Sequence, residues 1–193
     1  MIGKIGLPMP GTDWKIMDHE TGTREMPTGE NGELWVAGPQ VMVSYLNQPM
    51  ETAATIREMD GKRWLLTGDI GYMDEWGRVA ISDRKKQLIK VKGYSVFPKE
   101  VEELVGNHEG VSEVAAAGLP DVTTGEAIKV WVVLKPGYKE KLTEKELADW
   151  CKENISHYKV PKYIEFRDEL PKTLVGKVMR RQLQEADPLF DRK

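Results

Sequence analysis

The sequence contains one cysteine, Cys151, and no long hydrophobic run. A single cysteine excludes an intramolecular disulfide, and no Cys/His spacing typical of a zinc site accompanies it, so we expect no metal site and a reducing, cytoplasmic setting. No stretch reaches the roughly 18 apolar residues of a spanning helix, and no basic segment precedes an apolar leader. Neither a transmembrane helix nor a signal peptide is therefore expected.

The sequence also has little excess of charge of either sign. Its 28 lysines and arginines nearly balance 31 aspartates and glutamates, which gives a net charge of −3. This balance argues against a general nucleic-acid-binding surface. Any anionic ligand would therefore have to be bound by a few lysines or arginines at a local site. With 193 residues, 40% of them hydrophobic, the chain is long enough to bury a core in one or two small domains.

Residues 1–82 are predicted to form a β-rich unit. The segment "DWKIMD" alternates in polarity, "TGENGELWVAG" has an Asn31-Gly32 hairpin signal before an apolar strand, and "DEWG" separates two further strands. One short helix is expected over 51–59. The charged run "DRKKQ" at 83–87 then interrupts the pattern and indicates a hinge, with a solvated hairpin turn as the alternative.

Residues 88–193 change to an α+β pattern. The segment "QLIKVKGYSVF" predicts two strands that bend at Gly93, and Pro98 then occupies the first position of a helix. Two apolar strands follow in "VSEVAAAGL" and "AIKVWVVLK", the second of which is apolar enough to be central. "TEKE" at 143–146 is a capping box that opens a helix, "KYIEFRD" is a last strand, and "VMRRQLQEA" is a last helix. This order predicts a small sheet flanked by helices.

Four stretches contain residues that neither a core nor a solvated surface requires. Asp69 follows Thr67 and Gly68 at the end of an apolar strand, where a carboxylate can accept hydrogen bonds from both hydroxyls of a ribose. Arg84 offers a planar guanidinium to ribose or phosphate oxygens. Each has a simpler explanation by itself, because an aspartate after a glycine usually forms a turn and an arginine usually pairs with solvent or a nearby acid.

The other two stretches surround Gly93 and Lys177. Gly93 lies where a backbone bends or lets a ligand pass closely, although glycine bends strands without any ligand. Lys177 follows Gly176 in "LPKTLVGKVMRR", where a compact ammonium suits a transient anionic site such as a carboxylate attacking a phosphate. A loop lysine is usually only solvated. The functional interpretation gains weight because all four stretches occur in one chain in a fixed order.

In that order the stretches resemble the adenylate-forming enzymes, which include acyl-CoA synthetases, adenylation domains of peptide synthetases and firefly luciferase. "TGDIGYMDEWG" is similar to the ribose-binding motif, "SDRKKQLIKVKGYSVFPKEVEE" to the hinge motif, and "LPKTLVGKVMRR" to the motif with the adenylation lysine. The likeness covers about residues 3–187. Within this family, the segments "GPQVM", "YKVPKYIEFRDELPKT" and "GKVMRR" most resemble those of the long-chain fatty acid–CoA ligases.

The resemblance implies two half-reactions and a role for each site residue. Fatty acid and Mg-ATP give an acyl-adenylate and pyrophosphate, and the CoA thiol then displaces AMP. Asp69 would hold the AMP ribose with help from Arg84, Lys86 would be the hinge, and Lys177 would bridge the fatty-acid carboxylate and the phosphate. Gly93 would line the pantetheine path of CoA, with Lys90 and Tyr94 nearby.

The sequence has no Ser/Thr/Gly-rich phosphate loop and no recognisable acyl tunnel. The resemblance therefore implies a fragment that is inactive alone: the last β-rich subdomain of the AMP-binding domain (1–82), the hinge (83–87) and the C-terminal domain (88–193). The implied partners are the missing N-terminal domain, ATP or AMP, fatty acid and CoA, with peripheral membrane association left open. Two alternatives stay open: a separate non-catalytic nucleotide-binding or regulatory module, and an adenylase that loads a carrier protein instead of CoA.

Overall fold

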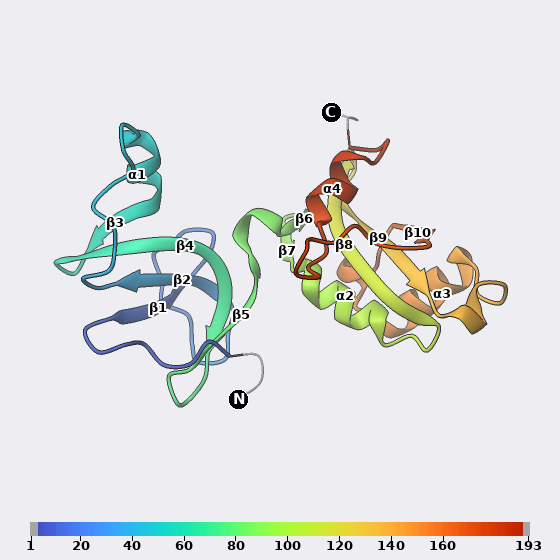
Figure 1. Ribbon diagram of the computed structural model, residues 1–193, viewed down its shortest axis with the longest axis horizontal. Helices are drawn as coiled ribbons and strands as arrows, with labels where there is room; N and C mark the ends of the chain where they lie inside the picture. Colours follow the sequence, from blue (N-terminus) through green and yellow to red (C-terminus); the bar gives the residue numbers. More distant parts are fainter. Residues whose placement is uncertain (1–3, 191–193) are drawn as a thin grey trace. The chain divides into compact units, whose positions relative to one another are not determined.

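The computed structural model describes residues 4–190, and the chain divides into two compact units, Met1–Lys86 and Gln87–Lys193 (Figure 1). The division falls inside the predicted hinge range of 83–87. Among the described residues, no helix has the length and apolar character needed to cross a membrane. Each unit has its own sheet, so the two are described separately.

The first unit is built on an antiparallel five-stranded sheet with one short helix. The strand order is β1-β2-β4-β3, and β5 also pairs with β4. Successive residues alternate between the two faces: Met17 and Trp35 join one buried cluster, while Ile16 and Leu34 join another. The elements are β1 (Asp13–Met17), β2 (Gly32–Ala37), α1 (Pro49–Thr55), β3 (Ile56–Met59), β4 (Lys62–Met73) and β5 (Val79–Arg84).

Two local predictions for this unit were wrong. Asn31-Gly32 is not a two-residue hairpin turn, because Gly32 is already the first residue of β2 and a long segment separates it from β1. The helix expected over 51–59 ends earlier, at Thr55, and residues 56–59 are strand β3. Ile56 is β-branched and pairs with Leu65 of β4, so cross-strand pairing outweighs continuation of the helix there.

The second unit is a five-stranded sheet of order β10-β9-β6-β7, with β8 also paired to β9. β10 runs parallel to β9 and the other pairs are antiparallel. Helix α2 packs on β8, α3 on β10, and α4 on β8 (Figure 1). The short helix η1 (Lys85–Gln87) spans the boundary between the units. The elements of the second unit are β6 (Ile89–Val91), β7 (Tyr94–Val96), α2 (Pro98–Gly106), β8 (Val111–Asp121), β9 (Gly125–Leu134), η2 (Pro136–Tyr138), α3 (Glu144–Asn154), η3 (His157–Lys159), β10 (Tyr163–Arg167) and α4 (Arg180–Glu185).

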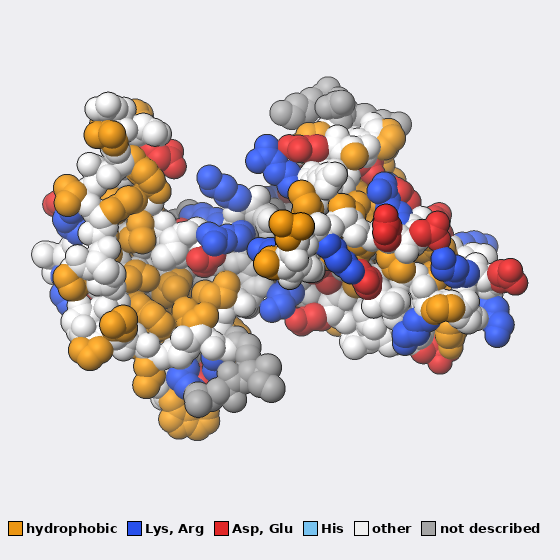
Figure 2. All heavy atoms as spheres, in the orientation of Figure 1, with side chains coloured by type: hydrophobic (Ala, Val, Ile, Leu, Met, Phe, Trp, Pro, Cys, Tyr) orange, Lys and Arg blue, Asp and Glu red, His pale blue; other side chains and the backbone are white. Residues whose placement is uncertain are grey.

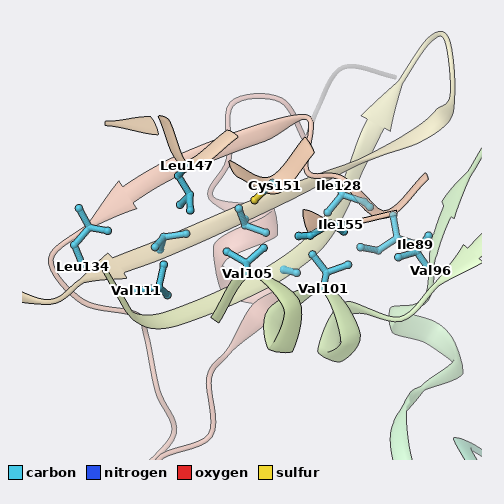
Figure 3. Close-up of a cluster of buried hydrophobic side chains, with 13 residues drawn as sticks. Ile89, Val96, Val101, Val105, Val111, Ile128, Leu134, Leu147, Cys151 and Ile155 are labelled. Carbon is cyan, nitrogen blue, oxygen red and sulfur yellow. The ribbon is translucent and has the colours of Figure 1, made fainter. Parts of the chain in front are cut away.

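The core of the second unit lies on both faces of its sheet. One face buries aliphatic side chains from β8 and β9 against Val101 and Val105 of α2 and Leu147 of α3 (Figure 3). Cys151 of α3 lies in the same cluster, and burial raises the pKa of its thiol to about 11. The other face packs Trp131 against Leu183 of α4. Strands β8 and β9 therefore alternate between two apolar layers rather than between core and solvent.

Most sequence signals for the second unit were confirmed. Pro98 opens α2, β9 is central, and Thr143 and Glu146 form both hydrogen bonds of the capping box of α3. These local signals agree with the tertiary packing, which is typical of natural sequences. The predicted α+β class is confirmed, since strands and helices are mixed along the chain in this order.

Candidate functional site

Asp69 lies in a bulge of β4. In the β2–β4 pairing, Trp35 faces Leu66 and Glu33 faces Ile70, so residues 67–69 lie opposite a single residue, Leu34. The bulge is held by local hydrogen bonds: Thr67 Oγ1 donates to the Leu34 carbonyl at 2.7 Å, and the Asp69 amide donates to Thr67 Oγ1 at 3.0 Å. A bulge redirects the side chains of its own residues, which here include the Asp69 carboxylate.

Asp69 and Arg84 are brought together by the sheet. They are paired residues of β4 and β5, and Arg84 Nε lies 2.7 Å from Asp69 Oδ1. The Asp69 side chain is 22% exposed and that of Arg84 is 59% exposed. The pair thus presents a partly buried carboxylate beside a more exposed guanidinium, which suits recognition of hydroxyl groups and a nearby phosphate.

Sequence reasoning missed Glu33, which supports this arrangement. Its buried carboxylate accepts a hydrogen bond from the Gly68 amide at 3.1 Å and an ion pair from Lys85 Nζ at 2.8 Å. Glu33 therefore connects the bulge to the first residue of η1. The available signal was a glutamate in the otherwise apolar strand "GELWVA", because a buried charge needs a partner. Lys86, the predicted hinge, is exposed within η1 and is the last residue of the first unit.

Gly93 and Tyr94 belong to the tight β6–β7 hairpin. Lys92 and Gly93 both have positive φ, 50° and 85°, as the two central residues of such a turn require. A Cβ on Gly93 would meet nothing within 4 Å, so the backbone conformation and not crowding favours glycine. Lys90 Nζ donates to Ser95 Oγ at 2.6 Å on the same hairpin.

A cavity of about 390 Å³ opens beside this hairpin in the second unit. The Tyr94 ring lies 5.4 Å from that of Tyr158, and both line the cavity, together with His157 and aliphatic residues. Thr124, also in the lining, is fixed by Asp121, whose Oδ1 accepts from its amide and hydroxyl. Hydrogen bonds from Lys162 and Thr124 hold the pKa of Asp121 well below its usual range, so this carboxylate stays charged.

Lys177 lies on a separate, protruding hairpin of residues 171–179. Lys172 and Val178 form a β-bridge, the Thr173 amide donates to the Lys177 carbonyl at 2.8 Å, and the Lys177 amide donates to Thr173 Oγ1 at 3.1 Å. Gly176 has φ +80°, which closes the turn. Lys177 is exposed, as are the apolar side chains at the tip, Leu174 and Val175. A backbone fixed in this way carries a lysine with a free-moving stem.

The candidate residues are thus divided between the units. Asp69, Arg84 and Lys86 belong to the first, whereas Lys90, Gly93, Tyr94 and Lys177 belong to the second. Within residues 4–190, no group of three or more His, Cys, Asp or Glu side chains could hold a metal ion. The first unit also exposes large hydrophobic side chains (Figure 2), which include Ile5, Leu7, Met9, Val43, Leu46, Met50 and Trp76.

Comparisons with known proteins agree on one family. The chain matches the AMP-binding enzyme family over residues 1–46 and the AMP-binding enzyme C-terminal domain over residues 100–177. It is 50% identical over 185 residues to a long-chain-fatty-acid–CoA ligase of Bacillus subtilis, covering 96% of this chain and 32% of that protein. A ligase of the same name from Escherichia coli O6:H1 is 48% identical over 183 residues, or 95% of this chain and 31% of its own length.

Solved structures give the same result. ATP-bound MatB from Rhodopseudomonas palustris superposes with a TM-score of 0.82 at 34% identity, covering 95% of this chain and 35% of that one. The o-succinylbenzoate CoA synthetase of Bacillus subtilis, in complex with an acyl-adenylate, gives 0.72 at 33% identity over 96% of this chain and 36% of its own. The chain spans about a third of the length of these relatives. From its two family matches and its fold, this chain belongs to the adenylate-forming superfamily of AMP-binding enzymes.

Proposed function

We propose that the chain is the part of an AMP-forming long-chain fatty acid–CoA ligase that contains the last β-rich subdomain of the AMP-binding domain, the hinge and the C-terminal domain. The reaction converts ATP, fatty acid and CoA into acyl-CoA, AMP and pyrophosphate through an acyl-adenylate. The observation that carries this proposal is the 50% identity to a ligase of that name over 96% of the chain. The order of the candidate residues along the chain supports it.

In the first half-reaction, Asp69 accepts hydrogen bonds from the ribose hydroxyls of the nucleotide. The bulge that aims its carboxylate and the 2.7 Å contact with Arg84 support this role. The guanidinium neutralises the carboxylate and keeps it oriented, and its exposure leaves it able to contact the ribose or a phosphate oxygen.

Lys177 supplies the positive charge for adenylation. The fatty-acid carboxylate must approach the α-phosphate of ATP, and two anions repel each other unless a cation lies between them. An ammonium at the end of a flexible stem, on a hairpin that protrudes from its unit, is suited to bridging the two. The hinge around Lys86 then withdraws this charge before the thiol attacks.

In the second half-reaction, the turn at Gly93 and its neighbour Tyr94 border the path of the CoA pantetheine, and Lys90 lies on the same hairpin. The apolar and aromatic cavity beside Tyr94 supports a binding role for this region. Magnesium enters as the ATP complex. The N-terminal remainder of the AMP-binding domain is the partner that supplies the phosphate loop and the acyl pocket, in the cytoplasm or at a membrane surface where fatty acids are available.

The test uses a chimera in which this chain replaces the matched 185 residues of the Bacillus subtilis relative. The chimera should form acyl-CoA, and the chain alone should form none. In the chimera, Lys177→Ala should lower fatty-acid-dependent ATP–pyrophosphate exchange by about 100-fold or more, because it removes a charge that stabilises the transition state. Thioester formation from supplied acyl-adenylate should be retained.

The matched control is Lys172→Ala, which removes a lysine from the same hairpin and should leave both steps within about 2-fold, since its exposed pair with Glu113 contributes little. If both steps survive Lys177→Ala unchanged, Lys177 is a solvated lysine and its catalytic role is refuted. If acyl transfer occurs only to a phosphopantetheinyl carrier protein, the CoA acceptor is wrong. If the chimera binds nucleotide without any turnover, the chain is a non-catalytic module.

A further inference from the structure

Arg180, the first residue of α4, forms a two-pronged ion pair with Glu102 of α2. Arg180 Nε lies 2.6 Å from Glu102 Oε1, and the guanidinium Nη2 lies 2.5 Å from Oε2. The two side chains are only 18% and 17% exposed. Paired, parallel hydrogen bonds of this kind fix both distance and orientation, and partial burial makes them stronger than a surface ion pair.

The pair is part of a larger network. Glu102 Oε1 also accepts a hydrogen bond from the Ala116 amide of β8 at 2.9 Å, so the carboxylate is held by the sheet as well as by Arg180. The third guanidinium nitrogen, Nη1, donates to Gln87 Oε1 at 2.9 Å. Gln87 is the first residue of the second unit and the last of the predicted hinge range. Arg180 therefore connects α2, β8 and the hinge end of the unit.

This network lies next to the segment that carries Lys177. Arg180 follows directly after the hairpin of residues 171–179, whose base closes where the Met179 amide donates to the Pro171 carbonyl at 2.8 Å. The tip of the hairpin makes no buried contact through Leu174 or Val175, which are both exposed. The direction in which Lys177 points is thus set at the base of the hairpin, where Lys172 forms an exposed ion pair with Glu113 and Arg180 forms the more buried one with Glu102.

We propose that Arg180 and Glu102 are positioning residues for adenylation: they hold the base of the Lys177 hairpin in a fixed relation to Gln87 at the hinge. A displacement of about 1 Å at a reacting group can cost on the order of 100-fold in rate, so a small rotation of the hairpin would be sufficient to impair catalysis. This inference rests on the proposed function, because it gives the network a task only if Lys177 acts in adenylation.

The experiment compares Glu102→Gln and Arg180→Lys in the chimera described above. Glutamine can still accept the hydrogen bond from the Ala116 amide but loses the negative charge. Lysine keeps the positive charge but cannot make the paired, parallel hydrogen bonds of the guanidinium. Each variant should lower the kcat of ATP–pyrophosphate exchange by about 10- to 100-fold while the KM for ATP and the rate of thioester formation from supplied acyl-adenylate change by less than about 2-fold.

Two further variants separate positioning from general stability. Glu113→Gln breaks the exposed ion pair with Lys172, which ties the same hairpin to the same strand without reaching the hinge, and it should leave exchange unchanged. Gln87→Glu, added to Glu102→Gln, returns a carboxylate to Arg180 from the hinge side. It should recover a large part of the lost exchange rate while the thioester rate and the Tm stay unchanged throughout, whereas a merely structural role would move both half-reactions and the Tm together.

The outcomes are distinguishable. If Lys177→Ala abolishes exchange but Glu102→Gln and Arg180→Lys leave it within about 2-fold, the positioning role is refuted and the proposed function stands. If both half-reactions fall together with the Tm, with or without recovery by Gln87→Glu, the pair only stabilises the fold and the inference is also refuted. If Lys177→Ala itself leaves exchange intact, the proposed function fails first.

Discussion

Replacing Lys129 by methionine should destabilise the second unit strongly. Lys129 is a charged residue within the apolar strand β9, and its Nζ lies 2.5 Å from Asp187 and 2.6 Å from Glu165. The Asp187 side chain is 1% exposed and that of Lys129 is 10% exposed. Methionine is an unbranched side chain of nearly the same length, so Lys129→Met removes the charge, together with its cation–π contact 5.4 Å from the centre of the Trp131 ring, without opening a large cavity.

The size of the destabilisation depends on the two carboxylates, Glu165 and Asp187, that lose Lys129 as a partner. Glu165 is a third exposed and keeps a second partner, Arg167, at 2.7 Å, so the loss of its ion pair with Lys129 should cost little stability. Asp187 stays buried with its charge uncompensated, and breaking one side of a buried pair costs about 3–5 kcal/mol. Replacing both partners, as in Lys129→Met with Asp187→Leu, removes the orphaned charge and should recover most of that loss.

Hydrogen exchange followed by mass spectrometry is the suitable assay, because peptides from β9 and α4 report the opening of the second unit separately from the first. The free energy of opening should fall by about 3–5 kcal/mol in the single variant and return to within about 1 kcal/mol in the double variant. A single variant within about 1 kcal/mol of the unmodified chain would show that Asp187 is not effectively buried, and would refute the reasoning.

The same cluster predicts a dependence on alkaline pH. Burial opposes the charge of Lys129, but the carboxylates of Asp187 and Glu165 outweigh it and raise its pKa above the ordinary value. A group whose pKa is raised by folding contributes stability that is complete below its unfolded-state pKa, about 10.4, and that is lost as pH rises through the folded-state value. The difference between the unmodified chain and Lys129→Met should therefore shrink above about pH 10.4.

Three further predictions concern other parts of the chain. A Cβ at Gly71 would lie 2.1 Å from a backbone carbonyl of β5, so Gly71→Ala should destabilise the first unit by about 1–3 kcal/mol in urea unfolding, whereas Gly137→Ala meets nothing within 4 Å and should be nearly neutral. The hydrogen bond from Lys162 lowers the pKa of Asp121, so the charged carboxylate stabilises the fold above about pH 4 and this contribution is lost as pH falls. In Asp121→Asn, the free energy of unfolding should therefore fall less between about pH 4 and lower pH than it does in the unmodified chain. Cys151 is buried with its thiol pKa raised to about 11, so it should react with a thiol reagent at pH 8 only after urea unfolds the second unit; rapid reaction of the folded chain would contradict that burial.

Local sequence determined much of this molecule. The capping box at Thr143 and Glu146, Pro98 at the start of α2 and the Lys92-Gly93 turn each depend on residues that are neighbours along the chain. Such signals act over one turn of helix or one hairpin, so they can be recognised before any fold is known. The order of the ribose, hinge and lysine motifs also identified the superfamily that the comparisons confirm.

Only the tertiary structure decided how the candidate residues are supported. Glu33 meets Lys85 52 residues further along the chain, and Glu102 meets Arg180 78 residues further along. Periodicity and propensity carry no information about which distant charges will be buried together, because that depends on strand register and on which helix covers which face. The sequence by itself therefore determined which residues are chemically suited to the proposed reaction, and the packing of the sheets and helices determined which distant side chains support them.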